Sequence, residues 1–203
     1  SLYQKLLEAL PKFFHSRRQE LIQHLTRLTR VRHARYSETI YHMEPNVKET
    51  PGGLRDLQLV RWLSQLRSAQ PYQMPVPEPV PELDGPREFL AKLRTFLHYT
   101  AGRDSNLLSF DAQEEISEQP FFPHRDAAAW MRDYFFGARA IYRAATRWME
   151  ITEGQGSVLL SQFRDWRSRV SNHEFTVSKE RVLLKTPAML VKGLLIQTAV
   201  DKW

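Results

Sequence analysis

The residue types best suited to chemistry gather in one stretch, residues 44–56, which reads EPNVKETPGGLRD. Its prolines favour an extended approach that ends in a Pro-Gly turn. Gly52 and Gly53 then lead into a predicted helix, whose first backbone N–H groups lack partners and carry the positive end of the helix dipole. Lys48 and Arg55 stand on either side of this turn. Such an arrangement suits the binding of a phosphate or a carboxylate.

The same loop also has a purely structural interpretation. Gly52 and Gly53 are what a tight chain reversal requires, whether or not a ligand is bound. Asp56, in the first turn of the predicted helix, meets the helix dipole favourably and would compete with a bound anion for the free N–H groups. The residues alone leave both interpretations open.

Other kinds of reactive site find no support in the sequence. The absence of cysteine excludes disulfides, thiolate catalysis and zinc–thiolate sites. His15, His24 and His33 would lie too far apart along a helix to share one metal ion, and we predict that they lie at the surface or its boundary. The Gly-x-Ser-x-Gly turn that presents a nucleophilic serine does not occur.

Composition and charge narrow the class of protein. The chain has 203 residues, an ordinary apolar content and a formal net charge of +6, supplied mostly by arginine. Such a charge suits nucleic acid, nucleotide phosphates or an acidic protein, but it is scattered along the chain, which makes nucleic acid the less favoured partner. Without a bilayer-spanning apolar run or a signal-peptide pattern, we expect a cytoplasmic protein and no membrane partner.

Apolar residues recur at helical spacing through most of the chain, which predicts an all-α fold, a multi-helix bundle. Pro11 is expected to separate a short first helix from a longer one. Another helix should follow the Gly-Gly turn, and a third should begin at Asp84 as its N-cap. The expected apolar faces of the first two long helices are Leu21, Leu25 and Leu28, and Leu59, Leu63 and Leu66.

Residues 124–150 form the clearest amphipathic helix. We interpret its basic side as a solvated face, with docking against an acidic protein surface as the alternative. The predicted buried side consists of Trp130, Tyr134, Ala138, Ile141, Ala145 and Trp148, and the basic side of Arg125, Arg132, Arg139, Arg143 and Arg147.

Two other segments depart from the helical pattern. Proline recurs through residues 71–86, which predicts an extended loop. In residues 174–203 the period changes: the runs 175–177 and 181–184 predict a small β-hairpin, and Thr186-Pro187 predicts the start of a final helix. We expect residues 1–203 to form a single helical domain.

The loop at residues 44–56 resembles a motif of the bacterial PII uridylyltransferase/uridylyl-removing enzyme family, E-P-N-(V/I)-K-x-x-P-G-G-L-R-D, which follows the nucleotidyltransferase domain. Its Lys48-to-Asp56 core is also similar to glutamine synthetase adenylyltransferases, but the downstream matches favour the uridylyltransferases. Those matches are Leu90, Arg94, Leu97, His98, Gly102 and Arg103, then Leu107, Leu108, Phe110, Asp111 and Gln113, then Met131, Arg132, Asp133, Tyr134 and Phe135.

The resemblance implies a helical domain that completes one wall of a nucleotidyltransferase cleft. The parent enzyme would use Mg²⁺ and UTP to transfer UMP to a tyrosine of the PII signal protein. The residues expected to orient nucleotide phosphates or brace the catalytic domain are Lys48, Gly52, Gly53, Arg55 and Arg103. Those expected to maintain the motif itself are Glu44, Asn46, Asp56 and His98.

His98 and Arg103 also allow a bottom-up interpretation. We expect His98 to hydrogen-bond a loop carbonyl, and Arg103 to pair with Asp104 or Asp111. These contacts would be structural, and direct contact of the two residues with a ligand is the alternative.

The departures from the family pattern concern catalysis. The sequence contains neither the Asp-x-Asp pair that holds Mg²⁺ in the nucleotidyltransferase domain nor the His-Asp dipeptide of the uridylyl-removing domain. We therefore expect a piece that lies between two catalytic domains, with regulatory ACT domains later still. It should hold no cofactor and be inactive on its own. Two alternatives stay open, a stand-alone interaction module that uses the basic helix face and, less favoured, a nucleic-acid-binding helical domain.

Overall fold

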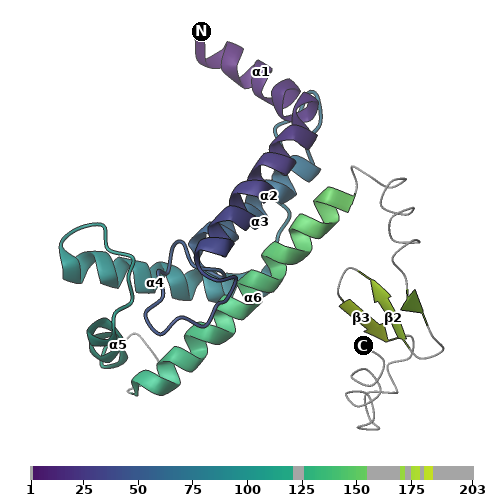
Figure 1. Cartoon of the computed structure of the whole chain (residues 1–203). Helices are drawn as coiled ribbons and strands as arrows, with labels where there is room; N and C mark the ends of the chain where they lie inside the picture. Colours follow the sequence, from purple (N-terminus) through teal and green to yellow (C-terminus); the bar gives the residue numbers. More distant parts are fainter. Residues whose placement is uncertain (1, 121–125, 155–169, 172–174, 179–180, 185–203) are drawn as a thin grey trace. The chain divides into compact units, whose positions relative to one another are not determined.

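The fold is described from a computed structural model (Figure 1). It describes residues 2–120 and 126–154, and the backbone of residues 170–171, 175–178 and 181–184. The chain divides into two compact units, Ser1–Glu153 and Gly154–Trp203, and each is treated by itself. The single domain predicted for residues 1–203 stays a prediction.

The first unit is helical, as predicted: within residues 2–120 and 126–154 the structure contains six α-helices and a short 3-10 helix, and no strand. No helix of this described part is long and apolar enough to span a membrane. The helices are α1 (Leu2–Ser16), α2 (Arg18–Arg35), α3 (Leu54–Arg67), η1 (Pro81–Leu83), α4 (Asp84–Ala101), α5 (Phe110–Ser117) and α6 (Ala127–Gly154).

In the second unit the described backbone contains three short strands, β1 (Val170–Ser171), β2 (Phe175–Ser178) and β3 (Arg181–Leu184). They pair antiparallel in the order β1-β2-β3. The paired strands β2 and β3 coincide with the expected strands, but the turn at residues 179–180 lies outside the described residues, so the hairpin stays a prediction. The expected helix after Thr186 also lies outside them.

The long helix α6 forms one side of the core of the first unit (Figure 1). Its predicted apolar face is confirmed, since all six of those residues are buried. They belong to one hydrophobic cluster with leucines of α3 and α4, and each fully buried leucine or isoleucine in such a cluster contributes about 1.5–3 kcal/mol. Four arginines of the predicted basic side are exposed, whereas Arg125 lies outside the described residues.

The helix α6 begins later than predicted, at Ala127 rather than at residue 124. Both carboxylate oxygens of Asp126 accept hydrogen bonds from the first turn, from the backbone N–H groups of Ala128 and Ala129 at 3.2 Å each. Asp126 therefore performs the N-capping role.

The apolar face predicted for α2 is confirmed only in part: Leu21 and Leu25 pack against the hydrophobic core while partly buried, but the centre of the buried face lies elsewhere. Leu28 is 47% exposed, and the buried residues are Ile22, Thr26, Thr29 and His33. These recur at helical spacing but are rotated away from the leucines. This rotation places His33 against the start of α3, where its ring hydrogen-bonds to the buried carboxylate of Asp56. A buried polar pair thus sets the rotation of the helix.

Two predicted helix boundaries are also wrong. Pro11 lies inside α1 as its one buried residue, and the chain breaks at Arg17 instead, because a proline removes only its own N–H and the remaining bonds hold the helix. Asp84 is not an N-cap: η1 runs straight into α4, so the chain is already helical there, and the Asp84 carboxylate pairs with Arg87 at 2.9 Å.

The proline-rich loop ends earlier than predicted. It extends only to Val80, because Pro81 begins η1 and Pro86 occupies the first turn of α4, where a missing N–H costs nothing. The extended part runs along α3: the Ser64 hydroxyl accepts a 3.2 Å bond from the Glu78 N–H, and the Ser68 hydroxyl donates to the Val76 carbonyl at 3.0 Å.

The orientation of α2 is tested by a matched pair of truncations, Ile22→Ala and Leu28→Ala. Ile22 is buried, so its truncation should lower the free energy of unfolding by about 2–5 kcal/mol, whereas a truncation at exposed Leu28 should change it by less than about 0.5 kcal/mol. Urea unfolding followed by circular dichroism measures both. A larger loss for Leu28→Ala than for Ile22→Ala would contradict this packing.

Candidate functional site

The site is built on the loop at residues 44–53, which pairs with a segment from much later in the chain. The Val47 N–H donates to the Asn106 carbonyl at 2.8 Å, and the Leu108 N–H donates to the Pro45 carbonyl at 2.9 Å. The Glu44 carboxylate accepts from the Phe110 N–H, at the start of α5, at 3.0 Å. Two of the motifs singled out in the sequence therefore form one structure.

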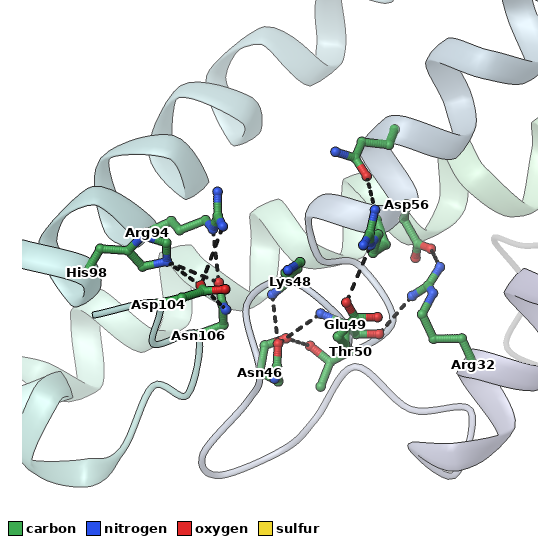
Figure 2. A network of polar contacts seen from close by, with 12 residues as sticks. Arg32, Asn46, Lys48, Glu49, Thr50, Asp56, Arg94, His98, Asp104 and Asn106 are labelled. Carbon is green, nitrogen blue, oxygen red and sulfur yellow. Dashed lines mark hydrogen bonds and ion pairs between the residues drawn. The ribbon is translucent and has the colours of Figure 1, made fainter. Parts of the chain in front are cut away.

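Asn46 closes the turn within this loop (Figure 2). Its side-chain oxygen accepts from the N–H groups of Lys48 at 3.1 Å and Glu49 at 3.0 Å. Its carbonyl accepts from the hydroxyl of Thr50 at 2.7 Å. The loop thus has a defined shape without a ligand, because one asparagine satisfies its inner polar groups.

The two glycines are required by the packing of the loop. Gly52 has a φ of +79°, and a Cβ atom built there would lie 2.3 Å from the carbonyl oxygen of Ala138 in α6. A Cβ atom at Gly53 would lie 2.8 Å from the Val47 carbonyl oxygen. Gly52 therefore lets the loop rest on the backbone of α6, and Gly53 lets it fold tightly on itself.

Asp56 is the buried centre of the loop. Its carboxylate accepts hydrogen bonds from the Gly52 N–H at 2.7 Å, from Nε2 of His33 at 2.9 Å and from the Arg32 guanidinium at 2.5 Å. The prediction that His33 lies at the surface or its boundary is wrong, since its side chain is 7% exposed and faces this carboxylate, which no local sequence pattern reveals.

The balance of forces on Asp56 favours its charged form. Burial is the largest single influence and acts to raise its pKa, but the hydrogen bond and charge of His33, together with those of Arg32, outweigh it and hold the pKa below its usual value. An ionised carboxylate therefore lies inside the protein, matched by two donors from α2 and one from the loop.

The backbone N–H groups that were expected to cradle an anion already have partners. Leu54 donates to the Val47 carbonyl at 3.0 Å, and Arg55 donates to the Lys48 carbonyl at 3.0 Å. The Gly53 N–H donates to the Thr50 carbonyl, and the Gly52 N–H donates to Asp56. The start of α3 is closed by its own loop, so an approaching anion would meet side chains rather than backbone donors.

Lys48 and Arg55 are the cationic side chains of this loop, and both are half-buried. Arg55 is held by Glu49 at 3.4 Å and by the Gln58 side-chain oxygen at 2.9 Å. For the Lys48 ammonium, no carboxylate of the described residues lies within ion-pairing distance. Its charge does reach Asp104, whose pKa is lowered first by a hydrogen bond from Asn106 and then, against an opposing effect of burial, by the charges of Lys48, His98 and Arg94.

The second motif forms a polar cluster beside Lys48 (Figure 2). Arg94 and His98, one turn apart on α4, both face Asp104, at 3.6 Å and 2.9 Å. Arg94 also donates from Nε to the Asn106 side chain at 2.9 Å. The contact of His98 is therefore with a carboxylate rather than with the expected loop carbonyl.

Arg103 does not make the predicted ion pair with Asp104 or Asp111. It is exposed, and it has no hydrogen bond or ion pair within the part of the chain that the structure describes. The reason is local: α4 ends at Gly102, in the left-handed region, so Arg103 leaves the helix face that carries Arg94. Arg94 takes the predicted role instead.

A buried tyrosine of α6 also contacts the loop, a role that the sequence did not reveal although it placed this residue on the buried face. Tyr134, in α6, is 1% exposed and hydrogen-bonded to the side chain of Thr50; burial raises the pKa of Tyr134 to about 12. The Met-Arg-Asp-Tyr-Phe motif is therefore tied to the same loop. Among the described residues, no group of three or more carboxylates and histidines is placed to hold a metal ion.

An open groove of about 580 Å³ lies next to this site. It runs between α3, residues 77–80 and α4, and leucine, valine and proline side chains line it together with three arginines. Arg94 belongs both to this groove and to the polar cluster, and Leu54 joins the groove to the loop. Its size is within the usual range for ligand sites.

The family model described as GlnD PII-uridylyltransferase matches residues 13–148, which contain the loop, the polar cluster and most of α6. The chain belongs to this family. It is 37% identical over 137 residues to a bifunctional uridylyltransferase/uridylyl-removing enzyme of Burkholderia mallei (strain SAVP1), across 62% of this chain and 16% of the relative. The resemblance noted in the sequence is confirmed.

A second relative supports the same family assignment. The enzyme of the same name from Burkholderia vietnamiensis (strain G4 / LMG 22486) is 34% identical over 165 residues, which is 76% of this chain and 19% of the relative. The chain therefore spans less than a fifth of the length of these relatives. No solved structure matches this chain.

Replacement of the central carboxylate, Asp56→Asn, should destabilise the fold by about 3–5 kcal/mol at pH 7, because it leaves the largely buried Arg32 guanidinium without a charged acceptor and removes the carboxylate that His33 contacts. The folded pKa of Asp56 lies below its unfolded value of about 3.9, so its contribution is present above that pH and is lost as the pH falls through the folded pKa. Urea unfolding at pH 7, 5 and 3 should show the wild-type advantage shrinking at the lowest pH. Exposed Asp111→Asn serves as the control, and an unchanged advantage at pH 3 would contradict the assignment.

The contact between the loop and α6 is tested by Gly52→Ala against Gly102→Ala. Both glycines have positive φ, so both substitutions carry a similar backbone strain of about 1–2 kcal/mol, but only at Gly52 would the new Cβ meet another backbone atom. The loss in unfolding free energy should therefore be clearly larger for Gly52→Ala. Equal losses would show that the close approach to Ala138 is unimportant.

Proposed function

We propose that this chain is the helical companion of a nucleotidyltransferase domain in a PII uridylyltransferase, with the catalytic Asp pair outside the chain. The observation that supports this proposal is the environment of Lys48. This lysine lies in the motif that we expect to follow the nucleotidyltransferase domain, and it is half-buried with no carboxylate of the described residues in ion-pairing range. A partly desolvated ammonium in this position favours the arrival of an anion such as a nucleotide phosphate.

The roles of the site residues divide accordingly. Lys48, Arg55 and Arg103 would contact or neutralise phosphate through their side chains, because the backbone donors of the loop have other partners. Gly52 and Gly53 would serve the site by shaping the loop rather than by touching the nucleotide. The groove beside Arg94 gives a bound substrate room next to these cations. This is electrostatic positioning, which supplies much of the catalysis in phosphoryl transfer.

The exposed apolar side of α1 supports a neighbouring domain. Most of its large apolar side chains are exposed, and only Pro11 of this helix is buried. A contiguous exposed apolar surface of this kind usually marks an interface. The nucleotidyltransferase domain of the parent chain is the partner we propose for it. The exposed residues are Leu2, Tyr3, Leu6, Leu7 and Phe13.

The proposed reaction is the transfer of UMP from UTP to a tyrosine of the PII signal protein. The Mg²⁺ and most of the nucleotide would be held by the Asp pair of the neighbouring domain, since the sequence has no Asp-x-Asp and the described residues offer no metal cluster. The chain alone should therefore show no turnover, and its contribution would be charge and shape at the edge of the cleft.

Complementation in trans tests the proposal. The chain is mixed with the nucleotidyltransferase domain encoded in the same genome, with PII, Mg²⁺ and labelled UTP. Lys48→Ala and Arg55→Ala should lower the rate of PII labelling by about 10²–10³-fold, the usual cost of losing one transition-state donor. Lys92→Ala, which removes an exposed lysine from α4, should label at the wild-type rate.

Folding of each variant is checked by its urea unfolding curve before the rates are compared. Normal labelling by both Lys48→Ala and Arg55→Ala, with folding intact, would mean that the motif is architectural. In that case the companion role would lose the observation that carries it.

A further inference from the structure

The exposed side of α6 carries a line of like charges. Arg132, Arg139, Arg143 and Arg147 are exposed and lie within about 80° of the helix circumference, along about 22 Å of its length. Phe136 lies in the same line and is 57% exposed. These five residues are called the arginine stripe here.

The guanidinium groups of the stripe are largely free of partners. Arg132, Arg143 and Arg147 make no hydrogen bond or ion pair within residues 2–120 and 126–154. Arg139 donates to the hydroxyl of Tyr41 and lies 5.9 Å from the centre of its ring. Tyr41 is itself exposed, so the stripe combines cations with two accessible aromatic rings.

Carboxylates near the stripe do not neutralise it. Glu150 continues the line at its C-terminal end, exposed and engaged in a contact of its own. Asp133 is half-buried beside the stripe and also engaged, while Glu153 pairs with Arg30 at 2.6 Å. Positive charge therefore dominates the line from residue 132 to residue 147.

The exposed face of α4 shows what a solvated helix looks like in this protein. There, opposite charges alternate and pair within the helix, as in Asp84–Arg87 and Glu88–Lys92. In α6, Arg139, Arg143 and Arg147 instead follow one another at i, i+4 spacing, which is unfavourable for an isolated helix. The arrangement becomes favourable when an outside row of negative charge neutralises it.

We propose that the arginine stripe is a docking surface for an acidic α-helix of another protein, whose carboxylates form a line along one face of that helix as the arginines do on α6. Arginine binds carboxylates through two parallel hydrogen bonds, and arginine and aromatic residues are the types enriched in protein interfaces. Four guanidinium groups are fewer than the roughly six to ten phosphate contacts that support strong nucleic-acid binding, so a protein partner is favoured.

The surface is separate from the nucleotide site. The loop rests on Ala138, which lies on the buried face of α6, whereas the stripe lies on the exposed face. A helix bound on the stripe would therefore leave Lys48 and its loop accessible. The inference does not rest on the proposed uridylyltransferase role.

The test uses the full chain and two synthetic helical peptides of identical composition. In one, glutamates repeat at i, i+4, i+7, i+11 and i+15 and form a line; in the other, the same glutamates are spread around the helix. Binding is measured by fluorescence anisotropy near physiological salt of about 0.15 M, where weak surface attraction is screened. The line peptide should bind at least about tenfold more tightly than the spread peptide.

Charge reversal then locates the site. The double variant Arg139→Glu with Arg143→Glu should abolish the preference for the line peptide. The control, Arg18→Glu with Arg61→Glu, changes the net charge equally at two exposed arginines outside the stripe and should keep the preference. Both variants are first shown to unfold like the wild type.

Three results would overturn the proposal. The first is that the two peptides bind with equal affinity, or that neither of them binds. Another is an equal loss of binding in the stripe and control variants, which would reduce the effect to net charge. The third is tighter binding of an oligothymidylate than of the line peptide, lost in the stripe variant, which would assign the surface to nucleic acid. None of these measurements involves uridylylation, so each leaves the proposed function standing.

Discussion

The hydrogen bonds that the buried Asp56 carboxylate accepts are the interactions on which the rest of this domain depends. This carboxylate joins α2 to α3 through Arg32 and His33, and it fixes the Pro-Gly-Gly turn through the Gly52 N–H. A buried charge is tolerated only when its partners are complete, so each of these elements constrains the others. One carboxylate needs several hydrogen-bond donors, and this need accounts for the rotation of α2, the shape of the loop and the packing of the loop against α6.

This arrangement changes how the Gly-Gly loop is understood. A glycine-rich turn before a helix looks like an open anion site, but here the protein supplies its own anion and its own carbonyl acceptors. The positive end of α3 is thereby used to stabilise the fold. What the loop leaves open to a ligand is Lys48, presented on a rigid turn beside the Arg94–His98–Asp104 cluster. In the proposed role, a charge held on a rigid turn would help to position a phosphate.

Among the described residues, several cations and apolar side chains stay exposed or lack a carboxylate partner, and they include three groups. The loop presents Lys48, α1 presents an apolar side, and α6 presents a line of arginines. A domain that is complete in its core but leaves apolar surface and cations open is organised to contact other structures. The match to less than a fifth of each relative's length agrees with that organisation.

The sequence by itself determined the helical class, the two faces of α6 and the family, because these depend on local periodicity and on one specific motif. It also marked most of the residues that meet at the loop, including Glu44, Asn46 and His98. It did not reveal which partners those residues take.

Only the tertiary structure decided those pairings. His33 lies in the core because Asp56 requires a donor there, and Arg94 rather than Arg103 binds Asp104 because α4 ends at Gly102. The backbone donors of α3 are closed by the chain that precedes them. Each of these outcomes depends on segments that are distant in sequence or on the angle of a turn, and helical periodicity carries no information about either.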